Sequence, residues 1–220
     1  MHKLANDRST FRFSPREIAR GVTVPATSPA TSPDLRIDPV ETRSQILPAY
    51  RGTAIGQLLA THNLGHEVPR DAHGELLIIT CMDHRVSIEV PPYFAYQLRT
   101  AGASPRPIIS NVAYAVAVDN VRAICVIGHT DCTMCTVNEQ TDELTETLIS
   151  RERWSLDDAY DQASVLERAF HIRNPVDAAW VASRQLAELF PSCLVAPLLY
   201  SVDDGSLMQI TDRPLDDDEL

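Results

Sequence analysis

Short apolar runs alternate with longer stretches of helical apolar spacing over most of the chain after residue 50. Residues 76–81 and 123–128 are apolar and rich in β-branched side chains, the pattern of a strand that is covered on both faces. Further strands are predicted at residues 94–99, 193–202 and 207–211. Asp203, Asp204 and Gly205 predict a hairpin turn between the last two strands.

Helices are predicted at residues 53–65, 107–122, 156–171 and 175–190, and residues 132–149 begin a helix that becomes polar and irregular. Strands that alternate with helices favour an α/β fold, because parallel strands are usually joined through a helix. We therefore predict a mainly parallel sheet flanked by helices, with a C-terminal antiparallel hairpin strand. In such folds the functional groups lie at the carboxyl ends of the strands.

The sequence divides into an N-terminal extension at residues 1–50, an α/β domain at 51–213 and an acidic tail at 214–220. Residues 22–39 contain Pro-Ala-Thr-Ser-Pro-Ala-Thr-Ser-Pro and predict a linker, because such a segment cannot bury enough apolar surface to fold alone.

Capping signals before this linker mark a short helix at residues 14–21, with Ser14 as the N-cap and Gly21 as the stop. A helix of about two turns is unstable alone in water. It either docks on another surface, which makes residues 1–40 a candidate binding segment for a protein partner, or it belongs to a disordered tail.

Composition and charge narrow the class of protein. The net charge of −11 argues against a general nucleic-acid-binding role. The N-terminus lacks the apolar core of a secretory signal, and no apolar run is long enough to span a membrane. Five cysteines, an odd number, in a chain too large to need disulfides favour a reducing compartment and thiols that bind a metal or catalyse. These features predict a soluble, cytoplasmic protein.

Two polar stretches follow the two most apolar runs, so they lie where predicted strands end. Residues 81–85 are Cys-Met-Asp-His-Arg, and residues 128–132 are Gly-His-Thr-Asp-Cys. Cys81, His129 and Cys132 together supply two thiolates and an imidazole. A set of three such ligands is typical of catalytic zinc sites, which leave one coordination position open.

Asp83 and Arg85 follow Cys81 at two-residue intervals. A carboxylate near a metal-bound water can accept its proton or orient it. An arginine beside the carboxylate keeps it ionised and fixes its direction. We therefore consider Asp83 and Arg85 candidate catalytic residues.

The remaining cysteines and histidines have simpler interpretations. Cys125 and Cys193 are expected to be buried apolar residues. Cys135 stands three positions after Cys132, so an alternative is a closed structural zinc site with Cys135 as the fourth ligand. That alternative assigns no function to Asp83 and Arg85. His84 is expected to point away from the site, and four further histidines are expected on the surface: His62, His66, His73 and His171.

Three motifs taken together resemble the β-class carbonic anhydrases: residues 81–85, Arg-Thr-Ala-Gly at 99–102, and residues 128–132. The helix after Pro107 and the C-terminal hairpin at 199–207 also look like that family, and the resemblance spans roughly residues 55–211. It implies zinc bound by Cys81, His129 and Cys132, and a homodimer or larger homo-oligomer.

The resemblance also implies the reaction. A zinc-bound hydroxide would attack carbon dioxide to give bicarbonate, with the catalytic pair Asp83 and Arg85 orienting the hydroxide. In some family members the equivalent aspartate moves onto the zinc and closes the site.

Some positions depart from the family pattern. Thr133 replaces the usual glycine after the last ligand, Thr100 replaces the usual asparagine, and the following loop contains Pro105 and Pro107. Two alternatives therefore stand beside carbon dioxide hydration: hydrolysis of carbonyl sulfide or carbon disulfide on the same fold, and an inactive zinc-bearing structural or partner-binding homologue. In any of these, the extension is a candidate for recruitment to an enzyme assembly or microcompartment.

Overall fold

The structure is a computed structural model that describes residues 34–67 and 74–212. Its centre is a six-stranded sheet with the strand order β1-β6-β5-β4-β2-β3. The strands are β1 Arg36–Asp38, β2 Leu76–Cys81, β3 Ala95–Thr100, β4 Ala123–His129, β5 Leu194–Tyr200 and β6 Leu207–Thr211. Strands β3, β2, β4 and β5 run parallel. At one edge β6 pairs antiparallel with β5, and β1 pairs antiparallel with β6.

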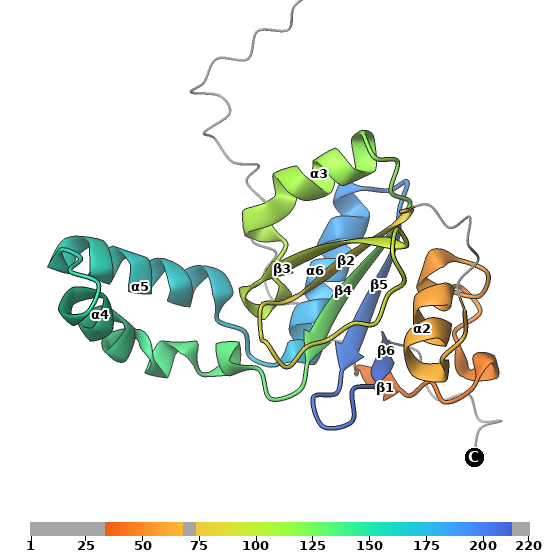
Figure 1. Ribbon diagram of the computed structural model, residues 1–220, viewed down its shortest axis with the longest axis horizontal. Helices are drawn as coiled ribbons and strands as arrows, with labels where there is room; N and C mark the ends of the chain where they lie inside the picture. Colours follow the sequence, from red (N-terminus) through yellow and green to blue (C-terminus); the bar gives the residue numbers. More distant parts are fainter. Residues whose placement is uncertain (1–33, 68–73, 213–220) are drawn as a thin grey trace, which may run out of the picture. The chain divides into compact units, whose positions relative to one another are not determined.

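Helices cover both faces of this sheet (Figure 1). The α-helices among the described residues are α2 Ala54–Leu64, α3 Ile109–Ala117, α4 Thr141–Ser150, α5 Leu156–Phe170 and α6 Pro175–Leu189. Helix α2 packs on one face, in a core cluster that includes Leu58, Ile78 and Ile127. Helices α3 and α6 pack on the other face, in a cluster that includes Val112 and Leu186. Because both faces are covered, every residue of β2 and β4 is buried.

The predicted fold class is confirmed, because the sheet is mainly parallel and ends in the β5–β6 antiparallel pair. The helix predicted at residues 107–122 is shorter than expected. A 3-10 turn at Arg106–Ile108 precedes α3, and Asn120 has a left-handed φ of 60°, which is incompatible with a continuing helix. The prediction for residues 132–149, a helix that becomes irregular, has the order reversed. Two 3-10 turns, Thr133–Cys135 and Val137–Glu139, come first, and the regular helix α4 follows them.

The division of the chain into extension, domain and tail stays a prediction, since residues 1–33 and 213–220, and with them the predicted helix at 14–21, lie outside the described residues. Within the described part, however, residues 34–50 pack on the α/β domain. Strand β1 pairs with β6, and the side chains of Val40, Ile46 and Tyr50 are buried in the α2 core cluster. The sequence placed them in the extension because a three-residue strand and isolated apolar side chains leave no periodic pattern.

The described part of the chain contains no helix with both the length and the apolar character needed to cross a membrane.

The end of β4 approaches α6 so closely that any side chain at residue 128 would force one of the two elements to shift. A Cβ atom at this position would lie 2.6 Å from the carbonyl oxygen of Pro175, the first residue of α6. Asn174 caps this helix by accepting a hydrogen bond from the backbone N–H of Asp177 at 2.8 Å. The start of α6 is therefore fixed by its cap. Because Gly128 has no side chain, β4 can pass close to this helix and continue to His129 at the edge of the sheet.

We expect Gly128→Ala to lower the free energy of unfolding by about 3 kcal/mol, because either β4 or the start of α6 must shift. Gly65→Ala is the matched control: its Cβ atom meets nothing within 4 Å, and only the left-handed φ of 66° opposes it. That control should cost about 1 kcal/mol. Urea unfolding followed by circular dichroism compares the two, and equal losses would contradict the close-approach argument.

Candidate metal centre

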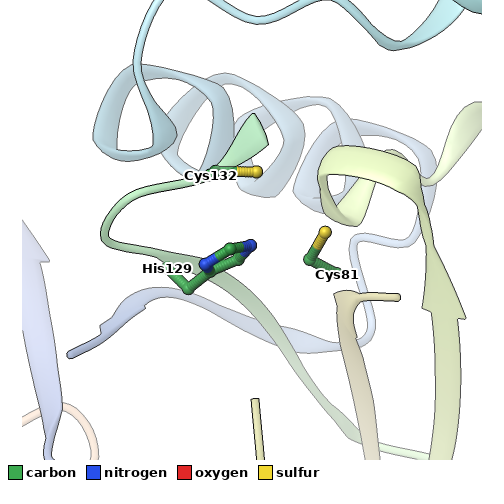
Figure 2. A group of neighbouring side chains, drawn as sticks. All are labelled: Cys81, His129 and Cys132. Carbon is green, nitrogen blue, oxygen red and sulfur yellow. The ribbon is translucent and has the colours of Figure 1, made fainter. Parts of the chain in front are cut away.

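Three candidate ligands meet at the carboxyl edge of the sheet. Cys81 is the last residue of β2 and His129 the last residue of β4, and these strands are parallel neighbours. Cys132 follows β4 after a tight turn in which Asp131 has a left-handed φ of 54°. The two sulfur atoms and a ring nitrogen of His129 all lie within 4.8 Å of one another, and all three residues are buried. Figure 2 shows both thiols and the imidazole directed toward a common point.

The hydrogen bonding of His129 leaves one of its ring nitrogens free. Its Nδ1 atom lies 2.8 Å from the carbonyl oxygen of Thr130. A carbonyl can only accept, so Nδ1 carries the proton and donates, which leaves a lone pair on Nε2 of the neutral ring. The Nε2 atom is buried and has no hydrogen-bond partner among the described residues. An unpartnered buried nitrogen aimed at two thiols fits a metal ligand, and the partner on Nδ1 is the support that ligating histidines usually have.

The two thiols lie in a setting that favours a thiolate. A hydrogen bond from Cys132 lowers the pKa of Cys81 to about 4, against the opposing effect of burial, and His129 and the backbone N–H groups of Asp83 and Gly102 lower it further. The pKa of Cys132 is raised because it shares the proton with Cys81 and is itself buried. A divalent cation would replace that shared proton. The donor set of two sulfurs and one nitrogen therefore fits zinc.

Charge also affects the imidazole. Burial of the His129 ring lowers its pKa, but the neighbouring Cys81 thiolate outweighs burial, so the pKa is raised overall. The site thus carries the negative charge that a bound cation would neutralise.

Asp83 lies at the margin of this cluster and is held by Arg85. Arg85 donates from Nε to Asp83 Oδ1 at 3.1 Å and from Nη2 to Asp83 Oδ2 at 2.8 Å, and its backbone N–H donates to Oδ1 at 2.9 Å. These bonds, opposed by partial burial, hold the pKa of the Asp83 carboxyl well below its usual range. Asp83 Oδ2 lies 4.0 Å from His129 Nε2, so the carboxylate faces Arg85 but remains close to the metal-binding atoms.

Arg99, on β3, fixes the loop that carries Asp83. Its guanidinium donates to three backbone carbonyls, those of Cys81 at 3.1 Å, Asp83 at 2.6 Å and Val86 at 2.9 Å. The sequence placed Arg99 in a motif but assigned it no role. The only sequence signal for such a role was the position of Arg99 at the end of a predicted strand.

The two unusual threonines lie beside the site rather than in the cluster. Thr100 is buried, and its hydroxyl donates to the Ser104 carbonyl at 2.8 Å. Thr133 is exposed. The backbone N–H of Met134 donates to the Cys132 sulfur and opposes the rise in its pKa. A side chain at position 133 leaves this ligand-facing contact in place.

The other cysteines and histidines follow the simpler interpretations in most cases. Cys125 is fully buried and Cys193 half-buried, and Cys135 is not part of the three-residue cluster. His84 and His171 are exposed and His66 is half-buried, whereas His73 lies outside the described residues. His62 differs from the surface position expected: it is half-buried, bonded to the Gly205 carbonyl at 2.7 Å, and it accepts from the Glu89 N–H at 3.0 Å.

Comparison with known proteins identifies the family and supports the fold. A family model described as carbonic anhydrase matches residues 76–189, more than half of the 220-residue chain. A solved β-carbonic anhydrase of Trichomonas vaginalis is 21% identical with a TM-score of 0.54, over 66% of this chain and 86% of that chain. A carbonic anhydrase from Glaciozyma antarctica is 19% identical with a TM-score of 0.51, over 75% of this chain and 96% of that chain.

A search of curated proteins gives no match. The family match is nevertheless sufficient for classification: the chain belongs to the β-class carbonic anhydrase family.

Replacing Cys132 by serine should remove most of the bound zinc, with less than roughly a tenth retained after dialysis, because a thiolate ligand is lost. Cys135→Ser should retain zinc at the level of the unaltered chain. Zinc content by atomic emission, measured on both variants, separates the two cysteines. Equal zinc loss in both would support the closed four-ligand site instead.

Proposed function

We propose that this chain catalyses the zinc-dependent, reversible hydration of carbon dioxide to bicarbonate. Family membership supports the class of reaction, and the observation that carries the proposal is the buried, unpartnered His129 Nε2 between two thiols. Cys81, His129 and Cys132 would hold the metal, and Asp83 and Arg85 would act on the reacting water.

Zinc at such a site lowers the pKa of a coordinated water toward neutrality and so supplies a nucleophile at physiological pH. The residues of the chain have the complementary task of orientation. Asp83 Oδ2 lies 4.0 Å from His129 Nε2, and in this proposal it would accept a hydrogen bond from the attacking water and fix its direction toward carbon dioxide. Arg85 keeps this carboxylate ionised across the neutral pH range, since it holds the pKa of Asp83 far below 7.

We expect zinc-loaded protein to hydrate carbon dioxide, and Asp83→Asn to lower kcat/KM about 100-fold while zinc content stays unchanged. Asparagine keeps the size of the side chain but loses the ionised acceptor. Stopped-flow measurement with a pH indicator, at matched zinc occupancy, gives the comparison.

The same preparation separates the alternatives. Turnover of carbonyl sulfide or carbon disulfide without carbon dioxide hydration would replace the proposed substrate by a sulfur analogue. Full zinc occupancy with no turnover of any of the three would identify an inactive zinc-bearing homologue, and the enzyme proposal would fail.

We further propose that the chain forms a homodimer or larger homo-oligomer in the cytoplasm. The family resemblance supports the assembly, and unpaired thiols at a metal centre suit a reducing compartment. Residues 1–40 remain a candidate docking segment for a protein partner, with recruitment to an enzyme assembly or microcompartment as the purpose.

Deleting residues 1–33, a cut that spares β1, should leave the mass of the oligomer unchanged in light scattering and should abolish co-purification of any protein partner. The full chain, purified in parallel from the same cells, is the control. An identical set of bound proteins in both preparations would contradict the docking role.

A further inference from the structure

Arg85 faces two aspartates, and only one of them belongs to the catalytic pair proposed above. Beyond its bonds to Asp83, Arg85 donates from Nη1 to the Asp131 carboxylate at 2.6 Å and from Nη2 to the Asp131 backbone carbonyl at 2.9 Å. The guanidinium is therefore bonded along two edges, one to each aspartate. Its plane is fixed because contacts on both edges must be kept at once.

The backbone at Asp131 explains how one residue can present both its carboxylate and its carbonyl to Arg85. Asp131 stands in the turn between two metal-ligand candidates, His129 and Cys132, and has a left-handed φ of 54°. Aspartate, asparagine and glycine adopt this conformation at least cost. The turn that places Cys132 thus also places the second anchor for Arg85.

The Asp131 contact matters locally rather than for overall stability. Its side chain is 80% exposed, and ion pairs at exposed positions contribute little to the free energy of unfolding. The Asp83 side chain, in contrast, is only 10% exposed and lies 4.0 Å from His129 Nε2. Since a carboxylate is itself a zinc ligand, Asp83 could compete for a coordination position on a metal held by Cys81, His129 and Cys132.

We propose that Asp131 is a positioning residue: it anchors the Arg85 guanidinium from the far side, so that Arg85 holds the Asp83 carboxylate turned away from the metal. Without this anchor, Arg85 keeps contacts on one edge only and its long side chain regains rotational freedom. The bidentate hold on Asp83 then loosens, and the metal competes for the carboxylate. The inference rests on the proposed zinc site and adds a residue that keeps this site open.

Two substitutions that both tolerate the left-handed backbone test this role. Asp131→Gly removes the acceptor, and Asp131→Asn keeps a side-chain oxygen in the same place. Each variant is loaded with cobalt(II) as a visible-absorbing substitute for zinc and titrated with azide, which binds at an open coordination position. Thermal unfolding of each variant verifies that the fold is intact.

We expect azide to bind about tenfold more weakly to Asp131→Gly, because it must displace Asp83, and to bind Asp131→Asn nearly as it binds the unaltered chain. Loss in both variants also supports the anchor and shows that its charge is needed. Unchanged azide binding in Asp131→Gly overturns the proposal.

An Asp83→Ala background makes the test specific. With the competing carboxylate gone, Asp131→Gly should have no further effect on azide binding, and a persistent tenfold loss would overturn the proposal. If the unaltered chain takes up neither zinc nor cobalt, the metal-site proposal falls and the role of Asp131 falls with it. If the unaltered chain binds metal and hydrates carbon dioxide while Asp131→Gly binds azide normally, only the role of Asp131 fails.

Discussion

The parallel pairing of β2 with β4 is the constraint on which the metal centre depends. Thr80 lies opposite Ile127 in this pairing, so the strand ends that carry Cys81 and His129 are neighbours. Both strands are buried along their whole length, and their apolar side chains supply the stability that fixes this register. The same burial removes water from the polar groups at the strand ends. An unpartnered buried polar atom such as His129 Nε2 costs on the order of 1–3 kcal/mol, a cost that a metal ligand bond would remove.

Two arginines organise the loop around this buried cluster in different ways. Arg99 reaches across from β3 to three backbone carbonyls and so fixes the path of the chain after β2. Arg85 acts on side chains, because its guanidinium lies between the carboxylates of Asp83 and Asp131. The planar, multidentate guanidinium suits both tasks, and a lysine at either position would supply a point charge without the fixed fork of donors. The direction of the Asp83 carboxylate is thus set by contacts that begin on β3 and on the turn after β4.

The sequence was sufficient for the parts that depend on local pattern or on ligand chemistry. The apolar runs at 76–81 and 123–128 predicted buried strands, and the thiols and imidazole at their ends predicted a three-residue cluster, which the structure brings together. It was not sufficient where the signal is non-local. Strand β1 is three residues long and is defined by its pairing with β6, far away in the chain. The contact between Arg85 and Asp131 spans 46 positions, and no spacing rule links residues across two different loops.

Both threonines that depart from the family pattern lie outside the three-residue cluster of candidate ligands. At the turn after Cys132, the N–H of Met134 contacts the ligand sulfur, and the Thr133 carbonyl accepts a hydrogen bond from the Thr136 N–H at 3.1 Å. At Thr100 the hydroxyl is used within the loop, as a donor to Ser104. Both threonines therefore alter the surroundings of the site without removing a contact to Cys81, His129 or Cys132. The three candidate ligands therefore do not rely on the side chain of either threonine.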